Sequence, residues 1–186
     1  MDHTIETILN RRSIRAYSSK PVSHNDLETI LSCGDAGPCG AGNRGWRYVV
    51  VQDPELKKRL IALGMPIYRK WLEKMPESFK ARRAEIDKSA DPIYYNAPVI
   101  VFVIGKGMSV DHNCPIVCQN LMLAARSLEI GSCWVQIGQL VLEDAAIRTE
   151  FGIVEGEKAF GPIILGYPAK EFPSRPAVSP SPVVWK

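Results

Sequence analysis

The chain has 186 residues, is 46% hydrophobic and carries a formal net charge of +3, which fits one domain with a packed core and argues against disorder. The small charge gives no broad basic field, so we expect no nucleic-acid partner. No apolar run approaches the ~20 residues that span a bilayer, and the N-terminus lacks the pattern of a signal peptide, so we expect no membrane association.

The first predicted element is a short helix over residues 4–11, with Ile5, Ile8 and Leu9 on one face. It leads into the segment from Arg11 to Arg15, which has three arginines and a serine but no acidic residue. Guanidinium groups suit a dianionic phosphate or a planar acceptor edge. The segment taken alone fits equally well a solvated basic cap at the end of the helix.

A second helix is predicted to begin at Ser23, an N-cap residue with Asp26 three positions later in an approximate capping box. A glycine-rich loop follows from Gly34 to Gly45, where the backbone could approach a flat ligand closely. Residues 47–52 then read as a strand, and residues 53–55 as the start of a helix with proline at its first position.

Residues 66–91 differ in character, because three prolines punctuate a charged, partly helical run at Pro66, Pro76 and Pro92. We expect this run to leave the core. It is either an ordinary pair of solvent-facing helices or a lid over a site, and the sequence supports both interpretations equally. As part of a lid, Tyr68 and Trp71 are candidate substrate-binding residues.

The second half of the chain alternates between strands and helices. Strands are predicted over residues 97–104, 132–137 and 161–168, and helices over residues 111–129 and 143–151. The helix over 111–129 has a wide apolar surface, which suggests a central helix shared with a second subunit, and Gly131 follows its end as a cap. The whole pattern indicates a layered α/β or α+β protein with a helix-covered sheet.

The last residues, 173–186, are rich in proline, which disfavours helix and central strand, yet they end in Val183-Val184-Trp185. We interpret them as an extended C-terminal arm that docks on another surface, most simply that of a partner subunit. A frayed terminus is the alternative.

Five cysteines stand at positions 33, 39, 114, 118 and 133. The odd number and the apolar surroundings of three of them predict reduced thiols and a cytoplasmic location. His112, Cys114 and Cys118 could be read as metal ligands, but the helical face of the two cysteines continues as Leu121 and Met122. Core cysteines are therefore favoured, and we expect no metal site.

Several common catalytic motifs are missing. The sequence has no G-x-G-x-x-G after a strand, no phosphate-binding Walker loop and no G-x-S-x-G. The three histidines lie in or next to helix starts, away from an obvious nucleophile, and no pair of carboxylates stands out. A classical dinucleotide fold and a hydrolase are therefore unsupported.

The chain instead carries a series of short motifs. The most specific is Arg-Arg-Ser-Ile-Arg-x-Tyr from Arg11, followed by Pro-Cys-Gly-Ala-Gly-Asn-Arg-Gly-Trp-Arg-Tyr-Val-Val-Val from Pro38. Shorter ones are Ala97-Pro98-Val99, Gln119-Asn120-Leu121, Gly131-x-Cys133-Trp134 and Gly166-Tyr167-Pro168-Ala169. In this order, from about residue 4 to residue 185, the chain resembles the nitroreductase family of flavin mononucleotide (FMN) oxidoreductases.

The resemblance implies a single nitroreductase-like domain over residues 1–186, an α+β three-layer sandwich whose central, mostly antiparallel sheet is covered by helices. It implies a homodimer with two FMN sites at the subunit interface. By position, Arg11, Arg12 and Ser13 would hold the phosphate and ribityl chain, and Arg15 would lie near the pyrimidine edge. The opposite subunit would contribute Pro38, Cys39, Gly40 and Asn43. Backbone contacts near N5 and O4 would come from Gln136, Ile137 and Gly138, and further phosphate contacts from Arg175 and Lys170.

Two features of the glycine-rich loop depart from the family pattern. Cys39 stands where the family has serine or threonine after the proline. When Trp46 is matched, Gly42 rather than Asn43 takes the place of the family's asparagine, and the usual glutamine near Arg44 is missing.

The resemblance also implies the chemistry, in which FMN carries out the redox reaction while the protein binds and orients it. Arg15 would stabilise the negative charge that develops at the N1–O2 edge on reduction, and a backbone N–H would face N5. We therefore predict no catalytic acid or base, NADH or NADPH as the electron donor, a nitroaromatic or quinone as the acceptor, and ping-pong kinetics. The alternatives are a reductive dehalogenase, a flavin-fragmenting enzyme, a non-enzymatic flavin-binding or phosphate-ligand module, and a structural dimer without a ligand.

Overall fold

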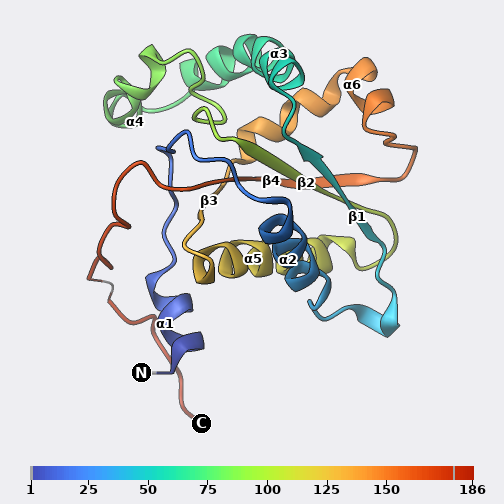
Figure 1. Cartoon of the computed structure of the whole chain (residues 1–186), viewed down its shortest axis with the longest axis vertical. Helices are drawn as coiled ribbons and strands as arrows, with labels where there is room; N and C mark the ends of the chain where they lie inside the picture. Colours follow the sequence, from blue (N-terminus) through green and yellow to red (C-terminus); the bar gives the residue numbers. More distant parts are fainter. Residues whose placement is uncertain (1, 178) are drawn as a thin grey trace.

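A four-stranded antiparallel sheet forms the middle layer of the computed structural model, which describes residues 2–177 and 179–186 (Figure 1). In spatial order its strands are β1 (Trp46–Val51), β2 (Val99–Gly105), β4 (Lys158–Gly166) and β3 (Gly131–Trp134). All seven residues of β2 are buried, as expected for a central strand with both faces covered. β3 is an edge strand, and Ser13 pairs with its residue Ser132 in an isolated bridge.

Helices cover both faces of the sheet (Figure 1). One face carries α3 (Pro54–Glu73), the 3-10 helix η3 (Gln136–Glu143) and α6 (Ala145–Glu150), and the other carries α2 (His24–Asp35) and α5 (Val110–Ser127). The side chains of β2 alternate accordingly. Val99, Val101 and Val103 join the core under α2 and α5, while Ile100, Phe102 and Ile104 join the core under α3. The predicted α+β three-layer sandwich is confirmed.

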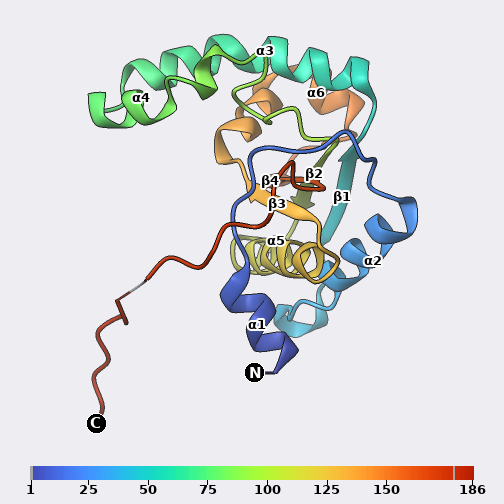
Figure 2. The same ribbon diagram turned by 60° about the vertical axis from the view of Figure 1, so that its left-hand side comes forward.

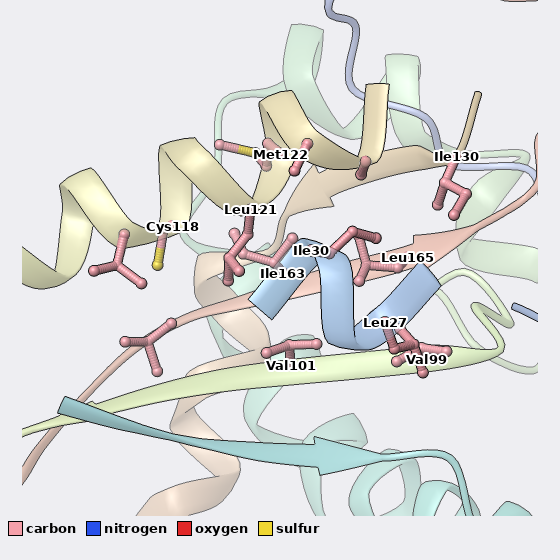
Figure 3. Close-up of a cluster of buried hydrophobic side chains, with 14 of the residues drawn as sticks. Leu27, Ile30, Val99, Val101, Cys118, Leu121, Met122, Ile130, Ile163 and Leu165 are labelled. Carbon is pink, nitrogen blue, oxygen red and sulfur yellow. The ribbon is translucent and has the colours of Figure 1, made fainter. Parts of the chain in front are cut away.

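The core between the sheet and α5 is formed mainly by aliphatic residues (Figure 3). Leu27 and Ile30 of α2 pack beside Leu121 of α5 and above Val99. Cys114 and Cys118 are fully buried in this cluster, so the interpretation of these thiols as core residues is confirmed. Burial raises the pKa of Cys114 to about 11 and that of Cys118 to about 12, which keeps both protonated at neutral pH.

The remaining helices lie at the periphery. They are α1 (His3–Asn10), η1 (Gly40–Gly42), α4 (Glu77–Arg83) and η2 (Ile86–Lys88). Ile5 and Ile8, the predicted apolar face of α1, are 48% and 51% exposed within this single chain. Figure 2 shows α4 extending past the sheet and the C-terminal arm leaving the body of the molecule. At the end of the arm, Val184 and Trp185 are 79% and 89% exposed.

Local predictions from the sequence were mostly confirmed. Ser23 caps α2, because its hydroxyl accepts a hydrogen bond from the Asp26 amide at 3.0 Å, and Pro54 opens α3. Pro66, the first proline of the run expected to leave the core, does not interrupt the helix, since α3 runs through it to Glu73. Pro66 is exposed, while Leu60, Gly64 and Tyr68 anchor the buried side of the helix on both sides of it.

The end of α5 also differs from the prediction. The expected cap, Gly131, is already the first residue of β3, and the chain reverses at Glu129, whose φ is 56°. Among the described residues, none of the helices combines the length and the apolar character that crossing a bilayer would need.

A bidentate ion pair joins Arg47 of β1 to Glu157, the residue just before β4. Arg47 donates from Nε to Oε1 of Glu157 at 3.0 Å and from Nη2 to Oε2 at 2.8 Å. The hydrogen bond from Arg47 holds the pKa of Glu157 below its usual value of 4.5. A carboxyl group with a lowered folded-state pKa stabilises the fold above its unfolded-state pKa and loses this contribution as the pH falls through the folded-state pKa.

We therefore expect Glu157→Gln to lower the free energy of unfolding by less than about 1 kcal/mol at neutral pH, since Arg47 is 38% exposed. The difference from wild type should shrink as the pH falls below 4.5, the usual pKa of this carboxyl. Urea unfolding over a series of pH values measures it, with Glu150→Gln at the more exposed pair with Arg59 as the control. A difference that stayed constant through the acid range would contradict this account.

Candidate functional site

The arginine-rich segment is held in place through its backbone. The Ile14 amide donates to the Ser132 carbonyl at 2.9 Å, the Ser18 amide donates to the Tyr167 carbonyl at 2.8 Å, and the Ala169 amide donates to the Ala16 carbonyl at 3.0 Å. Residues 13–18 thus run between the start of β3 and the chain that leaves β4 (Figure 2). We call this arrangement the backbone clamp.

Two glycines allow the clamp to form. Gly131 and Gly166 face each other across β3 and β4. A Cβ atom on Gly131 would lie 2.8 Å from Cβ of Ile14, and one on Gly166 would lie 2.8 Å from Cδ1 of Tyr17. Because glycine has no side chain, these two positions leave the space into which residues 14–17 pack. The clamp thereby fixes the main chain that carries Arg15 and that directly follows Arg12.

Arg12 is the best anchored of these arginines. Its Nη1 donates to the carbonyls of Leu9 and Arg11 at 3.0 and 2.6 Å, and its Nε donates to the carbonyl of Ser174 at 3.2 Å. Its Nη2 is buried and has no hydrogen-bond partner among residues 2–177 and 179–186. A buried donor without a partner is costly, so this atom marks a place where an acceptor from outside the chain would be stabilised.

The other cations of the site are less constrained. In the described part of the chain, neither Arg11 nor Arg15 pairs with a carboxylate, and Arg15 is exposed with its guanidinium carbon 5.8 Å from the centre of the Tyr95 ring. Exposed Lys170 lines the same hollow of about 230 Å³ as Ser13 and Arg15, together with Glu171. Exposed Arg175 follows Ser174, whose carbonyl contacts Arg12. Positive charge thus predominates at this hollow, whose lining includes Arg15 and Lys170 and one acidic residue, Glu171.

The turn after β3 offers free backbone donors. The first bond of η3 runs from the Gly138 amide to the Val135 carbonyl at 3.0 Å, and the Gly138 carbonyl accepts from the Tyr94 hydroxyl at 2.8 Å. Both backbone groups of Gly138 are thus occupied. The amides of Gln136 and Ile137 precede that first bond and have no backbone partner among residues 2–177 and 179–186, so both can donate to an acceptor.

A larger hollow, of about 540 Å³, lies beyond Gln136 and is lined by Trp134, Lys158 and Phe160 among others. Its size exceeds that of the hollow at Arg15, but three of its charged residues, Asp111, Glu157 and Lys158, are held in ion pairs. Lys158 donates to Asp111 at 2.6 Å, and Glu157 pairs with Arg47. We therefore give the smaller hollow beside the unpaired arginines more weight as an anion site.

The glycine-rich loop lies elsewhere in the same chain. Gly40 and Asn43 line a hollow of about 200 Å³ with residues 106–110 at the start of α5. The arginines lie beyond the opposite end of α5, so the two predicted parts of the site are well separated within one chain (Figure 1). Pro38 and Cys39 belong to the same loop, and Pro38 is exposed.

The two aromatic candidates for substrate binding differ. Tyr68 is 2% exposed, and its hydroxyl is engaged by Asp87 and by Arg83, so it is a structural residue within this chain. Burial raises its pKa to about 12. Trp71 is half-buried, with its ring 5.5 Å from that of Phe79 in an edge-on arrangement, and of the two it alone offers surface to a ligand.

The structure adds two residues that the sequence did not indicate, since Tyr95 lies beside Arg15 and Tyr94 supports Gly138. Cys133, from the Gly131-x-Cys133-Trp134 motif, is buried next to Ser13. Burial raises the pKa of Cys133, while Arg15 and Ser13 act in the opposite direction. Tyr94 and Tyr95 adjoin the Ala97-Pro98 motif, but no periodicity of the sequence shows that their side chains reach the site.

An α+β sandwich with clamped, unpaired arginines at one edge defines a protein suited to binding an anionic ligand. The family model described as Nitroreductase family matches residues 8–167. Since this match spans most of the chain, the protein belongs to the nitroreductase family.

Individual relatives agree with this assignment. A protein of Archaeoglobus fulgidus with the provisional name NADH dehydrogenase/NAD(P)H nitroreductase is 30% identical over 177 residues, which cover 92% of this chain and 88% of that protein. A protein of Methanothermobacter thermautotrophicus with the same name is 31% identical over 183 residues, covering 95% and 83%. A solved nitroreductase of Bacteroides fragilis with bound FMN has a TM-score of 0.76 at 26% identity and covers 100% of both chains.

The close contact between Gly131 and Ile14 gives a direct prediction. Gly131→Ala should lower the free energy of unfolding by about 1–3 kcal/mol, because the new methyl group would overlap three atoms of Ile14. Adding Ile14→Ala should make the double variant cost less than the sum of the two single changes. Thermal or urea unfolding measures both.

Gly152→Ala is the control for this prediction, since Gly152 has a φ of 60° but nothing within 4 Å of the added Cβ. Gly152→Ala therefore adds backbone strain without overlap, whereas Gly131, whose φ lies outside the left-handed region, gains overlap without this strain. Additive costs for Gly131→Ala and Ile14→Ala would contradict the clamp.

Proposed function

We propose that this protein is an FMN-dependent oxidoreductase that acts as a homodimer and passes electrons from NADH or NADPH to a flat acceptor such as a nitroaromatic or a quinone. The observation that carries the proposal is the clamped arginine segment with the buried, unpartnered Nη2 of Arg12. Family membership and the names of the relatives support the same conclusion.

The residues present fit the phosphate end of FMN. A phosphate oxygen would satisfy Arg12 Nη2 and remove the cost of a buried donor without a partner. Arg11 and the Ser13 hydroxyl would add donors from the same clamped segment. Lys170, which lines the same hollow, and Arg175 would contribute further positive charge.

The residues beside the phosphate fit the ring end. Arg15 would bring its charge to the pyrimidine edge, and the amides of Gln136 and Ile137 would face N5 and O4. Gly138 would serve through its backbone position, because its own amide is already bonded to Val135. The two amides are fixed by backbone structure before a ligand arrives, which is the condition for electrostatic preorganisation, and Arg15 leaves from the clamped main chain.

One copy of the chain makes an incomplete site. The hollow at Arg15 measures about 230 Å³, below the roughly 300–1,000 Å³ of typical ligand pockets. The loop with Pro38, Cys39, Gly40 and Asn43 cannot reach it within the same chain (Figure 1). In a homodimer this loop of the second copy would close the site, and the exposed apolar face of α1 and the C-terminal arm would find partners.

When bound, FMN would supply the two-electron redox chemistry, first taking electrons from the nicotinamide and then giving them to the acceptor. The protein's residues would bind the cofactor, orient its ring and exclude competing partners. No side chain at the site is required to move a proton. Donor and acceptor would use one face of the ring in turn, which predicts ping-pong kinetics. Trp71 is a candidate contact for the acceptor. A lid over residues 66–91 and a cytoplasmic location stay predictions.

The first test is an anaerobic titration of the FMN-loaded protein with NADH and with NADPH, followed by visible absorbance. We expect stoichiometric FMN uptake and bleaching by at least one nicotinamide, with colour restored by a nitroaromatic or a quinone. A protein that takes up no FMN contradicts the proposal. Bound FMN that neither nicotinamide bleaches would instead indicate a non-enzymatic flavin-binding module.

The second test separates the roles of two arginines. Arg12→Ala should weaken FMN binding by about tenfold or more, because it removes a charge-assisted contact to the phosphate. Arg15→Ala should lower the midpoint potential of the bound flavin while affecting affinity less. Fluorescence titration and potentiometry measure the two effects.

Arg59→Ala is the control for both changes, since Arg59 is exposed and pairs with Glu150 on α6. It should leave the affinity and the potential unchanged. Wild-type values for both Arg12→Ala and Arg15→Ala would remove the assigned roles.

A further inference from the structure

A buried carboxylate organises the chain just before β2. Asp91 is 2% exposed and accepts hydrogen bonds from the amides of Ile93, Tyr94 and Asn96 at 3.1, 2.7 and 2.9 Å. Tyr95 and Asn96 have φ values of 57° and 54°, in the left-handed region that non-glycine residues rarely adopt. Three bonds to one carboxylate hold this unfavourable backbone in place. We call residues 91–96 the Asp91 turn.

The Asp91 turn supports the turn after β3 through Tyr94. Tyr94 is 1% exposed, and its hydroxyl donates to the Gly138 carbonyl at 2.8 Å. Its ring lies against the same glycine, because a Cβ on Gly138 would be 2.5 Å from Cε1 of Tyr94. The position of η3, and with it the free amides of Gln136 and Ile137, therefore depends on Tyr94.

The next residue reaches the arginine segment. The Tyr95 ring lies 5.8 Å from the guanidinium carbon of Arg15, an exposed side chain that no ion pair holds among the described residues. The interaction of a cation with an aromatic ring restricts a long side chain that would otherwise sample many rotamers.

Tyr95 is itself fixed by Arg83. Arg83 donates from Nη1 to the Tyr95 hydroxyl at 2.8 Å and from Nη2 to the Pro92 carbonyl at 2.9 Å. Its Nε donates to the Tyr68 hydroxyl at 2.7 Å. The guanidinium group of Arg83, on α4, thus joins α3 to the Asp91 turn.

We propose that the Asp91 turn is a positioning element of the cofactor site, in which Tyr94 fixes the Gln136–Gly138 backbone and Tyr95 fixes Arg15. The inference rests on the proposed function, and it names residues that act through others without touching the ligand. Two consecutive side chains, directed by one strained turn, support two parts of the site that lie more than 100 positions apart in the sequence. This preorganises the ring-binding donors.

The first experiment needs no cofactor. In Tyr94→Phe, amide hydrogen exchange of the cofactor-free protein should accelerate by roughly threefold to tenfold over residues 136–143, because one buried hydrogen bond is lost. Exchange in α5 should stay at the wild-type rate. Tyr48→Phe, which removes a hydroxyl bonded to Asp35 in another part of the fold, should leave residues 136–143 unchanged.

The second experiment compares Tyr95→Leu with Tyr95→Phe in the FMN-loaded protein. Tyr95→Leu should lower the flavin midpoint potential, in the same direction as Arg15→Ala, and raise the Kd for FMN by roughly threefold to tenfold. Tyr95→Phe keeps the ring beside Arg15 and should recover most of the wild-type potential. A purely structural role for Tyr95 would change stability without moving the potential.

The outcomes separate the two claims. If the wild-type protein binds no FMN, the proposed function fails, and the exchange experiment still tests the contact between Tyr94 and Gly138. If the wild type binds FMN but Tyr95→Leu keeps its potential and affinity, the assignment for Tyr95 is overturned. Unchanged exchange over residues 136–143 in Tyr94→Phe overturns the assignment for Tyr94.

Discussion

The backbone clamp on residues 13–18 is the constraint on which the site depends. Three main-chain hydrogen bonds, with Ser132, Tyr167 and Ala169 as the partners outside the segment, hold an irregular segment against the end of the sheet. The segment fits only because Gly131 and Gly166 stand opposite each other in β3 and β4. These backbone bonds fix the main chain from which the Arg15 side chain leaves, while the Arg12 side chain is held by its own bonds to three carbonyls. Arg12 Nη2 remains without a partner among the described residues and available for a ligand, and part of the cost of ordering the site is met during folding.

The charges around the clamp explain why an anion fits there. Arg12 combines three donors bonded to carbonyls with a buried Nη2 that lacks a partner, and Arg11 and Arg15 have no carboxylate partner within the described residues. Elsewhere on the surface, cations such as Lys158 and Arg59 are paired with acidic residues. Among the described residues, three arginines without a carboxylate partner thus lie within one short segment, and in the proposed homodimer a second copy of the chain would close the small hollow beside it.

Local periodicity and capping chemistry predicted a layered protein with a helix-covered sheet, most elements and several caps, as at Ser23 and Pro54, while the α+β three-layer sandwich followed from the family resemblance. Pro66, the first proline of the run expected to leave the core, does not interrupt α3, because tertiary contacts of Leu60 and Tyr68 carry the helix onward. The cap expected at Gly131 was wrong, because the role of this residue depends on strand register. The arginine segment was predicted through its motif. The roles of Tyr94 and Tyr95 were not predicted, because the turn that carries them has positive φ angles at Tyr95 and Asn96, which a buried aspartate holds without a glycine to signal them.

The most direct test of this account is a crystal structure of the protein grown with FMN. The account predicts the phosphate within hydrogen-bonding distance of Arg12 Nη2, the ring against residues 136–138, and the loop of residues 38–43 from a second copy completing the site. An FMN bound elsewhere, or Arg12 Nη2 without contact to the phosphate, would contradict it, as would a site enclosed by a single chain.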